Sequence, residues 1–199
     1  ELSLLLSIPA SFGLVIASNE IINALFGYGS FSEENISMTA KALKYFGYGI
    51  PAFALIKVLA NFFFARDNTK TPFQISFFIV LLNVLISLIF FKKLGFIIIP
   101  IATSISAWFG VIFYYFMLKK NKALMFRSYL FSNILKIIFS SILMGIILFY
   151  GLDYFSENLN YTNKFKSIYL LFIVSFAATI YLITCYVLGI LKIKNYKTS

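Results

Sequence analysis

Long apolar runs alternate with short polar connections along the whole chain. Each run holds about 20 mostly apolar residues, which is the length that an α-helix needs to cross a lipid bilayer. The runs are too long for membrane β-strands, and they lack the residue-by-residue alternation that such strands show. The pattern therefore predicts an all-α integral membrane protein with six transmembrane helices, over about residues 2–25, 42–65, 73–91, 96–118, 129–150 and 167–191.

The composition narrows the class of protein further. Of the 199 residues, 61% are hydrophobic and only 12% are charged, whereas soluble domains are about half apolar and a quarter charged. A soluble enzyme and a disordered protein are thereby excluded. The chain has no histidine and a single cysteine, Cys185, so we expect neither a Cys/His metal site nor an intrachain disulfide. Glu1 enters an apolar run with no basic segment before it, which favours a fragment over a signal peptide.

The distribution of basic residues indicates an orientation in the membrane. The net charge is +10, from 17 Lys and Arg against 7 Asp and Glu. Most of the basic residues lie between the apolar runs, as is typical of loops beside an anionic membrane surface, and no nucleic-acid-binding motif accompanies them. Nine of them follow the second, fourth and sixth predicted helices, and six lie in the other connections. This bias predicts that both termini face the cytoplasm.

Basic residues inside or at the ends of predicted helices need a reason, because charge within a bilayer is costly. Lys57 either extends its stem to the cytoplasmic interface or faces a wet cavity that receives an anionic substrate. Arg66 is favoured as an interfacial anchor, with contact to an anion at the cytoplasmic mouth as the alternative. Lys136 is expected to extend toward the interface.

A group of small polar residues marks the third and fourth predicted helices. Asn83 and Ser87 lie four residues apart, on one face of a helix. Thr103 follows Pro100, and a proline within a helix frees a backbone carbonyl. Together these oxygens form an incomplete set of Na⁺ ligands, because no carboxylate lies in either helix. Hydrogen bonding between the two helices is the favoured interpretation.

Other signals concern helix ends and catalysis. Ser32 suits the N-cap of a helix that starts at Glu33. Gly47 and Gly49 interrupt the second predicted helix early and allow a kink. No nucleophile motif, nucleotide-binding loop or pair of carboxylates in a span is found, so we expect no enzyme activity and no cofactor.

Four motifs together carry a resemblance to a known family. They are Ile8-Pro9-Ala10-Ser11-Phe12-Gly13-Leu14, Leu25-Phe26-Gly27-Tyr28-Gly29-Ser30-Phe31, a stretch from Lys57-Val58-Leu59 through Ala65-Arg66-Asp67-Asn68-Thr69-Lys70-Thr71-Pro72, and Ala102-Thr103-Ser104-Ile105-Ser106-Ala107-Trp108. In their order and spacing they resemble the MurJ/MviN family of lipid II flippases. That family belongs to the multidrug/oligosaccharidyl-lipid/polysaccharide (MOP) exporter superfamily.

The resemblance implies a larger architecture and a function. Family members have fourteen transmembrane helices, and the six predicted here resemble the ninth to the fourteenth. Residues 1–120 would belong to the second lobe, and residues 121–199 would hold two extra helices, which line a lipid-facing groove in the family, and a basic cytoplasmic tail. The implied activity is alternating-access transfer of lipid II, an undecaprenyl-pyrophosphate-linked peptidoglycan precursor, from the inner to the outer leaflet of the bacterial cytoplasmic membrane. The membrane potential or an ion gradient such as Na⁺ would drive it, and cell wall synthesis machinery and membrane lipids are the expected partners.

The resemblance also suggests site residues. The family's tenth helix and the loop after it correspond to candidates for a substrate cavity or cytoplasmic gate: Lys57, Arg66, Asp67, Lys70, Thr71 and Pro72. A cation site proposed between the family's eleventh and twelfth helices corresponds to Asn83, Ser87 and Thr103, although Ser87 stands where the family also has an acid. The family's main cavity arginines lie in helices outside this chain.

Other functions stay open at the level of the sequence. The first alternative is a related MOP exporter, either a polysaccharide-lipid flippase or a drug/cation antiporter. The motif at residues 66–72 favours the lipid II flippase over this alternative. A membrane-bound transferase would need acidic or histidine residues at a membrane face, and none is convincing. A structural membrane subunit is a third class.

Overall fold

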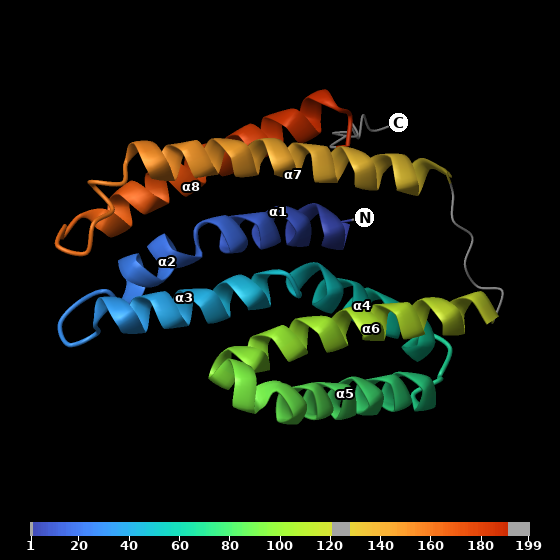
Figure 1. Ribbon diagram of the computed structural model, residues 1–199. Coiled ribbons are helices and arrows are strands. Elements are labelled where there is room, and N and C mark those ends of the chain that lie inside the picture. Colours follow the sequence, from blue (N-terminus) through green and yellow to red (C-terminus); the bar gives the residue numbers. More distant parts are fainter. Residues whose placement is uncertain (1, 121–127, 191–199) are drawn as a thin grey trace.

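The structure is a computed structural model, and it describes residues 2–120 and 128–190. Over these residues the fold is helical, with no β-strand (Figure 1). The elements are α1 (Leu2–Ile16), α2 (Ser18–Phe26), α3 (Glu33–Gly47), α4 (Ile50–Phe64), α5 (Lys70–Leu94), a short 3₁₀ turn η1 (Gly95–Ile97), α6 (Ile98–Lys120), α7 (Ser128–Tyr154) and α8 (Lys166–Val187).

The six predicted spans correspond to these helices. Four stretches of the described chain are long and apolar enough to cross a membrane, or five if the bent pair α1–α2 counts as one. One stretch, Lys70–Lys119, contains both α5 and α6, which fold back on each other at Gly95 (Figure 1). The prediction of an all-α membrane protein with six spans is therefore confirmed. There are more helices than spans because each of the first two spans consists of two helices, α1 and α2 in the first and α3 and α4 in the second.

The prediction of one continuous first span is wrong. α1 and α2 are separate helices, and their axes differ in direction by 76°. Ala17, the residue between them, is completely buried and is followed by the polar residues Ser18, Asn19 and Glu20. The apolar composition of residues 2–25 predicted the length of the span, but the bend depends on tertiary packing, which composition does not report.

The second span was predicted to start too late. A helix runs from Glu33 instead of from about residue 42, because its first turn is capped: the Ser32 side chain accepts a hydrogen bond from the backbone N–H of Asn35, at 3.3 Å. The acids Glu33 and Glu34 in the first turn also suit the positive end of the helix dipole. The predicted N-cap is confirmed, whereas the hydropathy pattern detected only the apolar part of the helix.

Glycines break the second span where the sequence predicts. α3 ends at Gly47 and α4 begins at Ile50, so the break leaves backbone carbonyls without helical partners. α6 supplies two of the missing donors. The hydroxyl of Ser104 donates to the carbonyl of Tyr45 at 2.6 Å, and the indole N–H of Trp108 donates to the carbonyl of Tyr48 at 3.0 Å. The motif at residues 102–108 therefore joins α6 to the broken helix.

Two groups of helices share α1 as their common neighbour. α5 packs on α6, and α6 packs on α4 around the buried side chains of Phe63, Ile75, Tyr114 and Leu118. On the other side, α7 and α8 pack on each other and on α1, around an apolar cluster that includes Leu5, Ile8, Met144, Leu148, Ile173, Ala177 and Cys185. The α1 helix contacts α3, α4 and α7, so it lies between the two groups (Figure 1).

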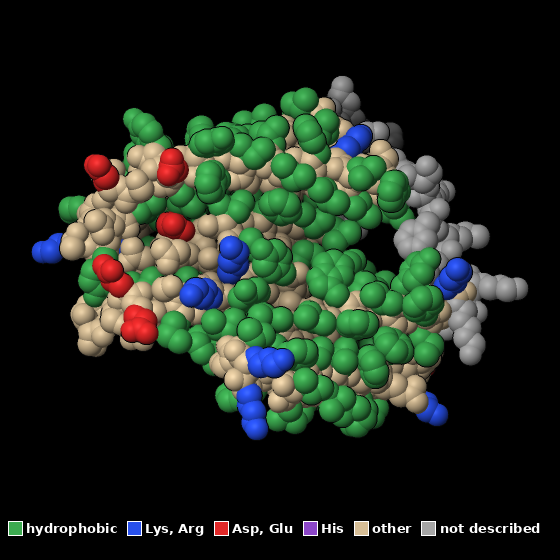
Figure 2. All heavy atoms as spheres, viewed as in Figure 1, with side chains coloured by type: hydrophobic (Ala, Val, Ile, Leu, Met, Phe, Trp, Pro, Cys, Tyr) green, Lys and Arg blue, Asp and Glu red, His purple; other side chains and the backbone are tan. Residues whose placement is uncertain are grey.

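The outer surface of the bundle is apolar, as a lipid-facing surface requires. Leu88 of α5 and Phe131 of α7 are 71% and 69% exposed, and apolar side chains cover the middle of the molecule (Figure 2). Acidic side chains gather at one end of this face, near the α2–α3 and α7–α8 connections (Figure 2). The acids of this region are Glu20, Glu33, Glu34, Asp153 and Glu157.

Gly49 permits the close approach of α6 to the break between α3 and α4. A Cβ atom at Gly49 would lie 2.7 Å from the Ser104 hydroxyl oxygen. We expect Gly49→Ala to destabilise the protein by about 1–3 kcal/mol, because the added carbon displaces that hydroxyl from the Tyr45 carbonyl. The thermal unfolding midpoint of the full-length protein in detergent measures the change.

Gly13→Ala is the matched control for Gly49→Ala. Gly13 lies within α1, and no atom outside its own stretch of helix lies within 4 Å of the position that its Cβ would take. Its midpoint should stay the same or rise, because alanine is the better helix former. Equal midpoints for the two variants would contradict the close packing at Gly49.

Candidate functional site

The α4–α5 connection is held together by its own polar residues. The side-chain oxygen of Asn68 accepts a hydrogen bond from the backbone N–H of Thr71 at 3.1 Å, and its amide donates to the Thr71 hydroxyl at 3.0 Å. The backbone N–H of Asn68 donates to the carbonyl of Phe63 at 3.0 Å. These bonds close the end of α4 onto the start of α5, where Pro72 is buried in the first turn.

Asp67 adopts a backbone conformation that most residues avoid. Its φ is +56°, in the left-handed region that Asp and Asn tolerate better than other non-glycine residues. The chain reverses direction at this residue, between the two ends that Asn68 ties together. The side chain of Asp67 is exposed. The contribution of this residue to the fold is therefore its backbone conformation, which allows the chain to turn from α4 into α5.

The charged candidates of this region lie on the outside of the molecule. Arg66 is exposed, and its guanidinium carbon lies 3.8 Å from the ring centroid of Phe62, which is a cation–π contact. Lys70 starts α5 and is exposed. Lys57 is exposed on α4, nine residues before Arg66, or about 14 Å along a helix. The structure therefore groups Arg66, Asp67 and Lys70 at one end and leaves Lys57 apart, and their role in a substrate cavity or gate stays a prediction.

The predicted polar group of α5 and α6 does come together. The side-chain amide of Asn83 donates to the Thr103 hydroxyl at 2.8 Å, and the Thr103 hydroxyl donates to the Ile99 carbonyl at 2.7 Å. The hydroxyl of Ser87 lies 3.4 Å from the side-chain oxygen of Asn83. A short chain of hydrogen bonds thus joins the two helices within the apolar part of the hairpin.

This donor set fits helix packing better than it fits a Na⁺ ion. The oxygens of Asn83 and Thr103 already take part in hydrogen bonds with neighbouring groups. α5 and α6 contain no acidic residue, so no carboxylate of these helices would balance the charge of a cation. The assignment of Asn83, Ser87 and Thr103 to a Na⁺ site stays a prediction.

One buried polar contact was not predicted from the sequence. Lys166, counted as a loop residue, begins α8 and is 0% exposed. Its ammonium donates to the side-chain oxygen of Asn23 at 3.0 Å, to the carbonyl of Gly27 at 2.6 Å and to the carbonyl of Tyr161 at 3.0 Å. The ring centroids of Tyr28 and Tyr161 lie 4.2 Å and 4.9 Å from the same nitrogen. We call this arrangement the Lys166 cage.

The Lys166 cage fastens α8 to the end of α2. Three N–H groups of the ammonium meet three oxygens, so every donor of this buried group has a partner. The next residue continues the contact, because the hydroxyl of Ser167 donates to the carbonyl of Ala24 at 2.8 Å. A Cβ atom at Gly27 would lie 2.9 Å from the Lys166 nitrogen, so glycine leaves the room that the ammonium needs.

A second lysine, Lys136 of α7, binds the opposite end of α8. The Lys136 ammonium donates to the carbonyl of Leu188, at 3.0 Å, directly after the end of α8. A cation there suits the negative end of the helix dipole. Lys136 was predicted to extend toward the interface, and its charge is used to close α8 onto α7.

Comparison with known proteins assigns the chain to a family. Residues 1–172 match the family model described as "Lipid II flippase MurJ". A relative from Rickettsia prowazekii named "Probable lipid II flippase MurJ" is 34% identical, and the match covers 83% of this chain and 39% of that protein. A relative of the same name from Buchnera aphidicola subsp. Baizongia pistaciae is 28% identical, and the match covers 97% of this chain and 38% of that protein.

A solved structure shares the fold. It is named "Lipid II flippase MurJ, inward closed conformation", and it superposes with a TM-score of 0.76 at 27% sequence identity. The match covers 92% of this chain and 36% of that structure's chain. The chain thus spans less than two fifths of the length of these relatives.

Replacement of Lys166 tests the Lys166 cage. We expect Lys166→Met to destabilise the protein by about 2–5 kcal/mol, because it leaves buried oxygens without donors. Lys164→Met, which removes an exposed lysine two residues earlier, should change stability by less than about 0.5 kcal/mol. Thermal unfolding of the full-length protein in detergent compares the two, and equal midpoints would contradict the structural role of the buried ammonium.

A pair of substitutions at Asp67 separates its backbone from its carboxylate. We expect Asp67→Ala to lower stability by about 1 kcal/mol, because alanine tolerates the left-handed region poorly. Asp67→Gly should keep or raise stability, because glycine adopts this conformation freely. The readout is the unfolding midpoint in detergent. An equal loss in both variants would place the requirement on the carboxylate.

Proposed function

This chain belongs to the MurJ family of lipid II flippases, and on that basis we propose that it forms the last six transmembrane helices of such a flippase. The whole protein would move lipid-linked peptidoglycan precursor from the inner to the outer leaflet of the cytoplasmic membrane by alternating access, for cell wall synthesis. The observation that carries this proposal is the family match over residues 1–172. Under it, the chain is part of a transporter and not of an enzyme, and its partners are lipid II and the surrounding lipids.

An apolar groove on the α7–α8 side suits the lipid part of such a substrate. The groove has a volume of about 430 Å³ and lies between α1, α7 and α8. Its walls are almost entirely apolar, with small residues at Pro9, Gly13 and Ala178 and larger ones at Leu6, Val174 and Leu182. A long prenyl chain gains free energy by burial against such walls. We propose that α7 and α8, the two extra helices of residues 121–199, form this lipid-facing side against α1, and that residues 1–120 belong to the second lobe.

The broken helices suit a protein that changes shape. The first span is interrupted at Ala17 and the second at residues 48–49, and these few residues belong to no helix. Transporters of several folds place such discontinuous helices where the protein binds its substrate or moves. We propose that Arg66, Asp67 and Lys70, at the α4–α5 connection, belong to a mouth that closes during the cycle.

The membrane potential suits the direction of the proposed transport. A pyrophosphate-linked lipid is an anion, and an inside-negative potential favours its outward movement by about 2.3 kcal/mol per charge at 100 mV. This driving force depends on the sign of the potential and the direction of transfer, and not on the orientation of the chain. We propose separately that the α4–α5 connection and the C-terminal end face the cytoplasm, which is the orientation that the Lys and Arg counts predict. An ion gradient such as Na⁺ is the other driving force that belongs to this proposal.

Growth of a flippase-depleted bacterium tests the function. The full-length protein should restore growth to a strain that lacks its own lipid II flippase, and Ala178→Trp should abolish the rescue, because the indole fills the groove. Thr179→Trp is the control, since Thr179 is the exposed neighbour on α8 and does not line the groove. Failure of the well-expressed protein to rescue growth, with normal transport of another lipid-linked sugar, would favour a related MOP exporter.

A further inference from the structure

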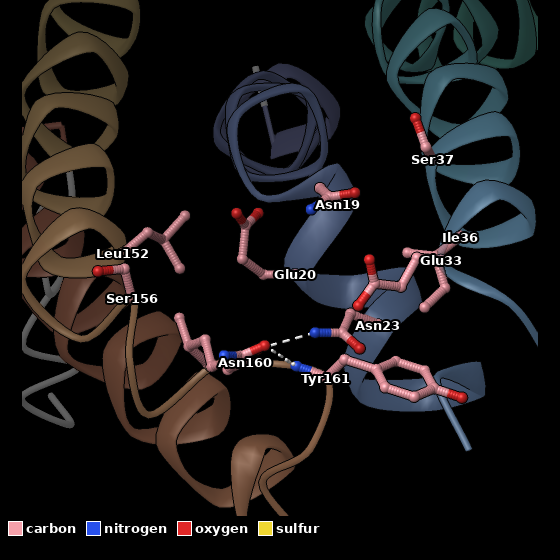
Figure 3. Close-up of a pocket in the computed structure, with 11 residues that line it drawn as sticks. Asn19, Glu20, Asn23, Glu33, Ile36, Ser37, Leu152, Ser156, Asn160 and Tyr161 are labelled. Atoms are coloured by element: carbon pink, nitrogen blue, oxygen red, sulfur yellow. Dashed lines mark hydrogen bonds between the residues drawn. The ribbon is translucent and has the colours of Figure 1, made fainter. Parts of the chain in front are cut away.

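A polar cavity lies beside the Lys166 cage and has no part in the proposed transport. It has a volume of about 450 Å³ and lies between α2, the start of α3, the end of α7 and the α7–α8 connection. Figure 3 shows Glu20 between Leu152 and Ser156 on one side and Asn19 and Glu33 on the other. Two carboxylates therefore line the cavity, Glu20 from α2 and Glu33 from α3, and its other lining side chains are uncharged.

Several polar groups of the wall are already engaged. The Asn23 amide donates to the carbonyl of Leu159 at 2.8 Å, and its oxygen accepts from Lys166. The side-chain oxygen of Asn160 accepts from the backbone N–H of Tyr161 at 2.7 Å. These bonds fix this part of the cavity wall, and among the side-chain groups that line the cavity one has a buried oxygen atom without a hydrogen-bond partner in the described part of the chain.

That group is the carboxylate of Glu20. Its Oε2 atom is buried and has no hydrogen-bond partner within residues 2–120 and 128–190. Glu20 lies in the first turn of α2, where the helix dipole favours a negative charge. A buried carboxylate oxygen without a donor is costly, so the cavity favours a ligand that brings a donor and a positive charge.

We propose that this cavity binds the ammonium group of a small organic cation, with Glu20 as its counter-ion. The volume is too large for one bare ion and lies within the range of small-molecule pockets, about 300–1,000 Å³. The described residues include no group of three or more His, Cys, Asp or Glu that would hold a metal ion. An ammonium needs fewer charged ligands, because its N–H groups also donate to hydroxyl and amide oxygens.

The charges around the cavity are compatible with this ligand. Glu33 lines the cavity with Glu20, and the neighbouring acids at this end of the molecule add a negative potential that attracts cations. Lys166 is a positive charge that contacts the wall, but its three donors are taken by Asn23, Gly27 and Tyr161. The same end of the fold therefore already binds one ammonium through neutral oxygens and aromatic faces.

Calorimetric titration of the purified full-length protein in detergent tests the proposal with two probes. Cadaverine stands for a free polyamine, and N-acetyl-lysine amide stands for the side chain of a peptide, so their relative affinity distinguishes the two sources of an ammonium group. We expect saturable binding of at least one probe. Glu20→Gln should weaken it by at least about tenfold, the equivalent of about 1.4 kcal/mol.

Two further variants keep the test decisive. Glu34→Gln removes an exposed acid of the same end that does not line the cavity, and it should leave the affinity within about twofold. Ser37→Trp fills the cavity from α3 without removing a charge and should weaken binding even if Glu20→Gln folds poorly. Unchanged affinity in Glu20→Gln, equal binding of the uncharged analogue 1,5-pentanediol, or binding of Ca²⁺ alone would overturn the proposal.

Discussion

A buried ammonium with uncharged partners is the interaction on which the polar end of this fold depends. Removing Lys166 from water is costly, and the fold offsets that cost with one amide oxygen and two backbone carbonyls. Carbonyls that close around an ammonium must be held at the correct places by their own chain segments. The cage therefore fixes three segments at once: the end of α2, the loop after it and the α7–α8 connection.

This constraint explains how the outer pair of helices attaches to the rest. α7 and α8 make their main contacts with each other and with α1 and α2, and the Tyr181 hydroxyl secures the other end of α8 by donating to the carbonyl of Leu5 at 2.6 Å. α8 is thus attached to α1 and α2 by the Tyr181 hydroxyl and the Lys166 cage, and to α7 by the Lys136 ammonium after its last turn. The α5–α6 hairpin depends on a different set of contacts, through α4 and the break before it.

The sequence predicted the spans well because their length and apolar composition follow directly from the thickness of a bilayer. It also predicted the Ser32 cap and the break at Gly47 and Gly49, which depend on local backbone chemistry. The bend at Ala17 and the burial of Lys166 were missed, because both depend on partners far away in the chain. Two acceptors of the Lys166 ammonium are backbone carbonyls, and any residue type would supply such a group. The gate and cation-site residues stay predictions, because their exposure and hydrogen bonds are equally those of a connecting loop and of a helix–helix contact.

The bonds from α6 to the broken helix have a mechanical consequence. A carbonyl without a donor is far more costly in a lipid environment than in water, so α3 and α4 cannot change their mutual angle freely while Ser104 and Trp108 occupy the carbonyls between them. α6 therefore holds the joint, the break between α3 and α4, at a fixed angle. Any rearrangement at the joint must either carry α6 along with it or exchange both hydrogen bonds for new ones, so the hairpin and the joint form a single mechanical unit.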